Sequence, residues 1–344
     1  MSSFRLYVIF LVCLFFQALS FGQSIYVGAE LNFTNEKSKL DRSELYNFDK
    51  FNNGLIKKEI LKICKDCELH KVDGWPQVTY PDGWWFKPTV DTGVVEIKTL
   101  KTTANEYRQK YKNHLDDIFL LMRKFNFKPD PQGGLSHMHI DYETAFHSNI
   151  IHFRNYLVHL INHQGTLELL GAHDANGKFN AVFLSEMYKK ETIEPFIDYL
   201  NKLDEKILFG HKLPSISEFI DLLPEEMRRK FVAINLQHSE TMEIRSLSSP
   251  KNSDQFIDTA AFLTGAIEYV KKVGGLIPLE EIRHPNLWTE QEKIDSFHQF
   301  SVTQGKDSED FKHRVLKPEQ WYLTPSENQK EIKPIIRSCP LLFL

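Results

Sequence analysis

The chain has 344 residues, with 42 lysines and arginines against 46 aspartates and glutamates, and its mean hydropathy is −0.36. This near balance of charge excludes the basic excess of a general nucleic-acid-binding protein, so we expect no nucleic-acid partner. The length suits one large domain or two modest ones, with a hydrophobic core that needs no disulfide scaffold.

The N-terminal segment indicates a secretory signal peptide at residues 1–22. Arg5 is followed by an almost wholly apolar run at residues 6–19, and the small residues Ser20 and Gly22 suit cleavage. Later apolar runs are too short to span a bilayer. We therefore expect a secreted or periplasmic protein without stable membrane insertion once the signal is removed; an uncleaved signal anchor is the alternative.

Residues 23–290 form the predicted catalytic domain, and residues 291–344 a polar C-terminal extension. The first half of this domain alternates strands, turns and helices. Strands are predicted at residues 25–33, 84–86, 94–97 and 135–140, and helices at residues 55–63 and 107–125.

The second half of the domain begins with long helical patterns. Helices are predicted at residues 146–161, 186–203 and 254–273, and a hairpin of two strands at residues 231–236 and 241–247. Strands, then helices, then strands again predict an α+β fold, with helices grouped on one face of a mostly antiparallel sheet.

Several conspicuous side chains have ordinary structural explanations. Cys64 and Cys67 close a predicted helix, which favours a local disulfide or packing over a zinc site. The cluster of four aromatic residues is expected to pack in the core rather than to line a sugar or peptide groove. The three histidines at helical spacing are expected at the edge of an amphipathic helix rather than as zinc ligands. These residues are Trp75, Trp84, Trp85 and Phe86, and His152, His159 and His163.

Four predicted strand segments each carry acidic, imidazole or guanidinium groups. They are Gly28–Glu30, Val94–Ile97, Ser136–His139 and Met242–Arg245. Residues two apart in a strand project to the same face, while the apolar residue between them enters the core. Charged groups beside apolar neighbours need partners, so the pattern indicates a cavity that binds a hard divalent ion such as Mg²⁺ or Mn²⁺.

The order of these segments and their local sequences resemble those of the amidoligase family, which shares the catalytic fold of glutamine synthetase and glutamate-cysteine ligase. Gly28–Glu30 resembles the opening G-x-E strand, Asp91–Ile97 the second acidic strand, and Gly134–His139 the H-x-H strand. Lys230–Leu236 followed by Thr241–Arg245 resembles the closing hairpin.

The resemblance implies an enzyme that uses ATP and Mg²⁺ (or Mn²⁺) to join a carboxylate to an amine through an acyl phosphate. The carboxylate substrate would be a small molecule or a glutamyl group of a peptide or protein. By position, the implied metal ligands are Glu30, His137 and Glu243, with Glu96 on a second metal. The residues implied to face the nucleotide phosphates are His139, Lys230 and Arg245.

Two positions depart from the family pattern. Asn32 stands where a second carboxylate is usual, and no acid stands at Pro88, although Asp91 is near. These departures leave open a secreted, catalytically inactive binding protein of the same fold. A second alternative is a metal-dependent oxygenase, because H-x-H with a downstream Glu also fits a cupin-type metal site. A cupin-type oxygenase would be nearly all strand, whereas long helical stretches separate His139 from Glu243.

Overall fold

The structure is a computed structural model that describes residues 24–34, 43–91, 94–129, 136–171, 189–228, 233–280 and 289–305. The predicted signal peptide and Lys230 lie outside these ranges. Among the described helices, none is both long and apolar enough to cross a membrane.

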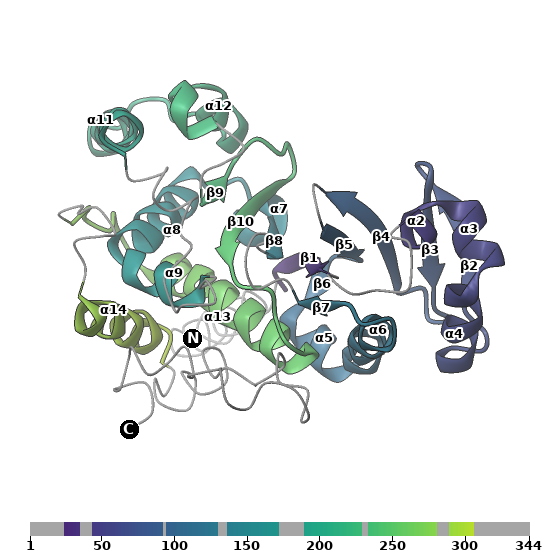
Figure 1. Cartoon of the computed structure of the whole chain (residues 1–344). Coiled ribbons are helices and arrows are strands. Elements are labelled where there is room, and N and C mark those ends of the chain that lie inside the picture. The colour runs from purple at the N-terminus through teal and green to yellow at the C-terminus, as the bar shows by residue number, and fades with distance from the viewer. Residues whose placement is uncertain are drawn as a thin grey trace, which may run out of the picture.

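The described strands form one sheet with the order β2-β3-β4-β5-β1-β8-β10-β9, and the short strands β6 and β7 also pair with β1 (Figure 1). All the pairings are antiparallel. The strands are β1 (Tyr26–Thr34), β2 (Glu68–Val72), β3 (Trp75–Thr79), β4 (Trp85–Asp91), β5 (Val94–Thr99), β6 (Thr102–Thr103), β7 (Lys128–Pro129), β8 (Ser136–Asp141), β9 (Ile234–Asn235) and β10 (Thr241–Leu247). The predicted α+β class with a mostly antiparallel sheet is confirmed.

Helices pack on this sheet and on one another. They are α2 (Ser43–Tyr46), α3 (Phe48–Asn53), α4 (Leu55–Ile63), α5 (Ala104–Gln109), α6 (Lys112–Lys124), α7 (Tyr142–Phe146), α8 (Ile150–Asn162), α9 (Gln164–Leu170), α11 (Lys190–Leu208), α12 (Ile216–Asp221), the 3₁₀ helix η1 (Glu225–Arg228), α13 (Ser253–Lys272) and α14 (Glu290–Thr303). The long helix α13 contacts α5, α6 and α8, and Figure 1 shows it lying beside α5 and α6.

Strand alternation divides the central strands into a core face and a polar face. The core face of each strand carries apolar side chains that are at most 2% exposed, such as Leu31 of β1, Met138 of β8 and Ile244 of β10. The intervening residues point the other way. The charged residues singled out in these strands therefore share the opposite face of the sheet.

The predicted elements agree well with the observed ones at β1, α4, β10 and α13. Two predicted helices differ. The predicted helix at residues 107–125 is divided into α5 and α6, and the one at residues 146–161 is divided into α7 and α8. The second break follows from left-handed backbone at His147 (φ 48°) and Ser148 (φ 57°), which no helix can include.

The structure also tests the structural explanations predicted for the cysteine pair, for Trp84 and for His159. Cys64 and Cys67 form a disulfide directly after α4. Trp84 is fully buried and stacks on Tyr111, which confirms core packing for it. His159 is 2% exposed, so the expectation that it lies at a helix edge is wrong. The ring of Phe300, from α14, stacks on the His159 ring and covers it.

The predicted boundary between residues 290 and 291 falls at the start of α14. This helix packs on α9, and its Phe297 and Phe300 belong to the same buried core as the sheet. The division into domains stays a prediction, and the described part of the predicted extension contributes core side chains.

Candidate functional site

The register of the central strands brings the charged residues together on the polar face. Glu30 of β1 lies opposite Lys98 of β5 on one side and opposite His137 of β8 on the other. Glu243 of β10 lies opposite His139 of β8. Residues that are registered across antiparallel strands project to the same face, so these five side chains form two adjacent rows on one face of the sheet.

Glu243 lies at the centre of the group and is 1% exposed. Its Oε1 is 2.8 Å from His137 Nδ1 and 2.6 Å from Arg245 Nη1. Its Oε2 accepts a hydrogen bond from Asn235 Nδ2 at 2.6 Å and lies 3.1 Å from His238 Nε2. Burial alone would raise the pKa of Glu243, but hydrogen bonds from His137 and His238 and the charge of Arg245 hold it far below its usual range. Glu243 is therefore a buried carboxylate held ionised.

Glu30 is the second buried carboxylate. Its Oε2 lies 3.1 Å from His137 Nδ1, and its Oε1 lies 3.1 Å from His139 Nε2 and 2.6 Å from Lys98 Nζ. Burial opposes ionisation, yet the two histidines and Lys98 together hold the pKa of Glu30 well below its usual value. Two carboxylates from different strands thus remain charged within reach of one imidazole.

His137 is the point at which these carboxylates meet. Its Nδ1 faces oxygens of both Glu30 and Glu243, although a ring nitrogen carries at most one proton. Burial lowers the pKa of His137, but the two carboxylates outweigh burial and raise it. Two anionic oxygens converging on one imidazole nitrogen form a donor set that suits a divalent cation.

Two groups of side chains could hold such an ion. One consists of Glu30, His137 and Glu243, and the other of His139, His238 and Glu243; within each, the potential ligand atoms lie within 4.8 Å of one another. Both groups share Glu243. All three members of the first group are largely shielded from solvent, whereas the His238 side chain is 46% exposed.

Glu96 stands at the edge of the group. Its Oε2 accepts a hydrogen bond from Thr89 Oγ1 at 2.9 Å and lies 3.2 Å from Lys98 Nζ. Burial and the nearby charge of Glu30 raise the pKa of Glu96. On β1, the residue opposite Glu96 is the buried and neutral Asn32.

The structure thus brings together most of the residues predicted for the site. Glu30, His137, His139, Glu243 and Arg245 form one contiguous group, and Glu96 joins it through Lys98. Lys230 lies outside the described residues. Their roles in binding metal and nucleotide stay predictions.

Three members of the site were missed as functional candidates. His238 lies in the turn between β9 and β10, where neither strand alternation nor motif spacing points to it. Lys98 contacts the site because of its register with Glu30, and a sequence read one strand at a time does not give that register. Asn235 belongs to a quoted motif, but its bond to Glu243 follows from the hairpin pairing.

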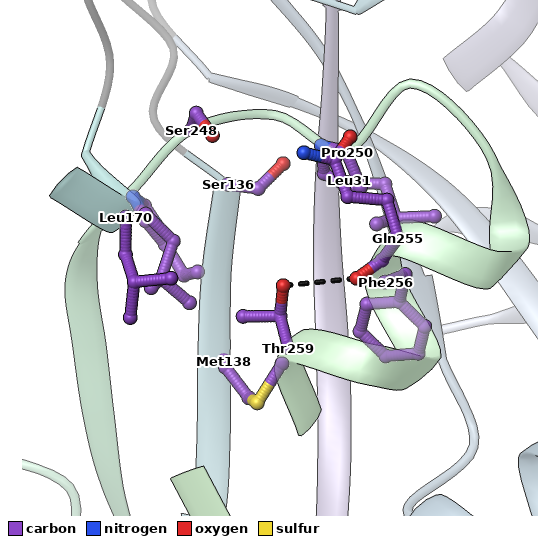
Figure 2. Close-up of a pocket in the computed structure, with 11 residues that line it drawn as sticks. Leu31, Ser136, Met138, Leu170, Ser248, Pro250, Gln255, Phe256 and Thr259 are labelled. Atoms are coloured by element: carbon purple, nitrogen blue, oxygen red, sulfur yellow. Dashed lines mark hydrogen bonds between the residues drawn. The ribbon is translucent and has the colours of Figure 1, made fainter. Parts of the chain in front are cut away.

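A small pocket lies on the core side of the same strands, between the sheet and the start of α13. Figure 2 shows Leu31, Met138 and Phe256 in its wall, together with Thr259, which donates a hydrogen bond to the carbonyl of Gln255. Its wall is mainly apolar and also includes His137 of the charged group described above.

Comparisons with known proteins give little sequence similarity. The chain matches no known protein family and no curated protein. Among solved structures, one described as "GmaS/ADP complex-Conformation 1" is similar in fold at 8% sequence identity and a TM-score of 0.40, covering 84% of this chain and 67% of that one.

Proposed function

We propose that this protein is an exported, ATP-dependent carboxylate-amine ligase. One observation carries the proposal: carboxylate oxygens of Glu30 and Glu243 meet the same nitrogen of buried His137, beside a buried arginine. This donor set suits Mg²⁺ or Mn²⁺, and a bound ion would neutralise the phosphate oxygens of a nucleotide.

The chain's own residues would position the reactants and stabilise charge. Arg245 and His139 lie beside the proposed ligands Glu243 and Glu30, where each could donate a hydrogen bond to a phosphate oxygen. Such fixed donors, in a site shielded from water, stabilise charge that develops in a transition state.

The proposed reaction has two steps. A carboxylate oxygen of the substrate attacks the γ-phosphorus of ATP, and ADP leaves. An amine then attacks the acyl carbon of this acyl phosphate, losing a proton as inorganic phosphate departs and the amide forms. The carboxylate would come from a small molecule or a glutamyl group of a peptide or protein, and the predicted signal peptide supports export.

The architecture disfavours one of the two alternatives. The mixed α+β architecture, with helices α7, α8, α9, α11 and α12 between β8 and β9, differs from the nearly all-strand fold expected of a cupin-type oxygenase. A catalytically inactive relative would bind no nucleotide, so nucleotide binding separates it from the proposed ligase.

The first test is calorimetric titration of the protein with a non-hydrolysable ATP analogue, with and without Mg²⁺. We expect binding that requires Mg²⁺ and that weakens by at least roughly tenfold in Glu243→Gln, because the variant removes an anionic ligand. Glu240→Gln is the matched control: it makes the same change at a side chain that is 80% exposed, and should bind like the wild type.

Circular dichroism would establish that each variant is folded. Failure of the folded wild type to bind the analogue would favour the inactive relative. Equal binding by Glu243→Gln and Glu240→Gln would remove Glu243 from the site.

A further inference from the structure

The ammonium group of Lys98 lies between two carboxylates at the edge of the site. Its Nζ is 2.6 Å from Glu30 Oε1 and 3.2 Å from Glu96 Oε2. Both contacts follow from the backbone, because Lys98 is registered opposite Glu30 and stands two residues after Glu96 on the same face of β5. Lys98 is thus built into the position between these carboxylates.

We propose that Lys98 takes the place of a second divalent ion, so that the chain binds one ion at Glu30, His137 and Glu243 and uses a fixed ammonium between Glu30 and Glu96. This inference rests on the metal site of the proposed function. It replaces the expectation that Glu96 serves a second metal.

The few anionic groups around Glu96 suit one bound positive charge. The residue opposite Glu96 on β1 is the neutral Asn32, and the residue opposite it on β4 is Thr89, whose hydroxyl already donates to Glu96. Glu96 and one oxygen of Glu30 are therefore the anionic groups that the described residues offer here. One ammonium can be satisfied by these two carboxylates, and a divalent ion could use the same oxygens only where the ammonium is absent.

A neighbouring lysine also disfavours a second dication. Lys87 of β4 is registered opposite Lys98 and projects to the same face; its ammonium lies 3.5 Å from the exposed carboxylate of Asp73. A divalent ion beside Glu96 would have to displace Lys98 and remain next to two positive charges. Repulsion between like charges opposes that arrangement.

The test counts metal ions per chain by elemental analysis after equilibration with Mn²⁺ and removal of free ion. We expect one ion in the wild type and two in Lys98→Met, because the methionine fills the same space without charge and leaves Glu30 and Glu96 facing each other. The double variant Lys98→Met/Glu96→Gln should return to one ion. Lys101→Met is the matched control, and it should bind one, since Lys101 pairs instead with Asp141.

A second measurement uses thermal unfolding and needs no nucleotide. Without metal, Lys98→Met should be less stable than the wild type, and either Mn²⁺ or the added Glu96→Gln change should restore the loss. Lys98→Gln serves the same purpose if Lys98→Met does not fold.

Two ions in the wild type, or an unchanged count in folded Lys98→Met, would overturn the proposal. Loss of the single ion in His238→Ala would place it at the other group of ligands and would also overturn it. Ion counts of one, two and one in a protein that binds no ATP analogue would support this inference while overturning the ligase function, so the two failures are distinguishable.

Discussion

The two oxygens of the Glu243 carboxylate have different surroundings. Oε1 faces His137 and Arg245, which are both buried, while Oε2 accepts from the amide of Asn235. A glutamine at this position would turn one oxygen into a donor that faces other donors. Replacing Glu243 therefore removes a charge and also leaves buried polar partners mismatched, which explains why we expect a conservative change to be costly.

His159 shows how burial affects a histidine outside the site. Its ring is stacked on Phe300 at 4.7 Å, and His163 lies against it. Burial, with a smaller contribution from the charge of His163, lowers the pKa of His159 from 6.5 to about 3. Protonation therefore favours the unfolded chain as the pH falls below 6.5, and His159 costs no stability above that value.

His159→Phe should make the protein less sensitive to mild acid. The unfolded histidine gains a proton near pH 6.5 and the folded one does not. The wild type should therefore lose about 2 kcal/mol of unfolding free energy through this residue between pH 7 and pH 5. The variant should not show this loss. Urea unfolding at the two pH values measures the difference. His211→Gln removes an exposed histidine and should leave the pH dependence unchanged; equal losses in all three proteins would contradict the assignment.

At the scale of elements, α14 completes the core beside α8 and α13. Phe300 is fully buried and contacts both His159 and Phe262. The same helix presents Val302 to solvent, with 54% of its surface exposed. Phe300 is therefore an anchoring side chain of this helix, and Val302 is a nearby position that suits a control.

Phe300→Ala should destabilise the protein by about 3 to 5 kcal/mol, because it leaves a cavity in the packed interior. Val302→Ala should change the unfolding free energy by less than about 0.5 kcal/mol. Chemical denaturation of both variants gives the comparison. A small effect of Phe300→Ala would mean that α14 is not needed by the core, as expected if residues 291–344 were an independent extension.

How much the sequence predicted depends on whether a feature is local. The alternation in β8 and β10 is local, and it predicted that His137 projects with His139 and that Glu243 projects with Arg245. The turn at His147 and Ser148 was missed because neither residue is a glycine, although both adopt left-handed backbone.

Features that depend on pairing between distant strands could not be predicted in the same way. Lys98 looks like an ordinary strand lysine until β5 is registered against β1. The position of an ammonium between Glu30 and Glu96 follows from that register, and the proposed number of ions depends on it.

At the scale of the whole molecule, a bound ion should stabilise the fold. Mn²⁺ at about one hundred times its dissociation constant should add about 2.7 kcal/mol to the unfolding free energy and raise the melting temperature by several degrees. Differential scanning fluorimetry at constant ionic strength measures the shift. Glu243→Gln should show none, and an equal shift in both proteins would indicate binding elsewhere.

The order of the strands in the sheet has a consequence for biosynthesis. The ligands of the proposed ion come from β1, β8 and β10, which span the chain from residue 30 to residue 243. A nascent chain that has not yet placed β10 beside β8 has Glu30 and His137 but lacks the carboxylate that completes the set. The proposed ligand set is therefore complete only once β10 has paired with β8. If the chain is exported as proposed, the metal supply on the far side of the membrane, rather than that of the cytoplasm, would decide which metal it acquires.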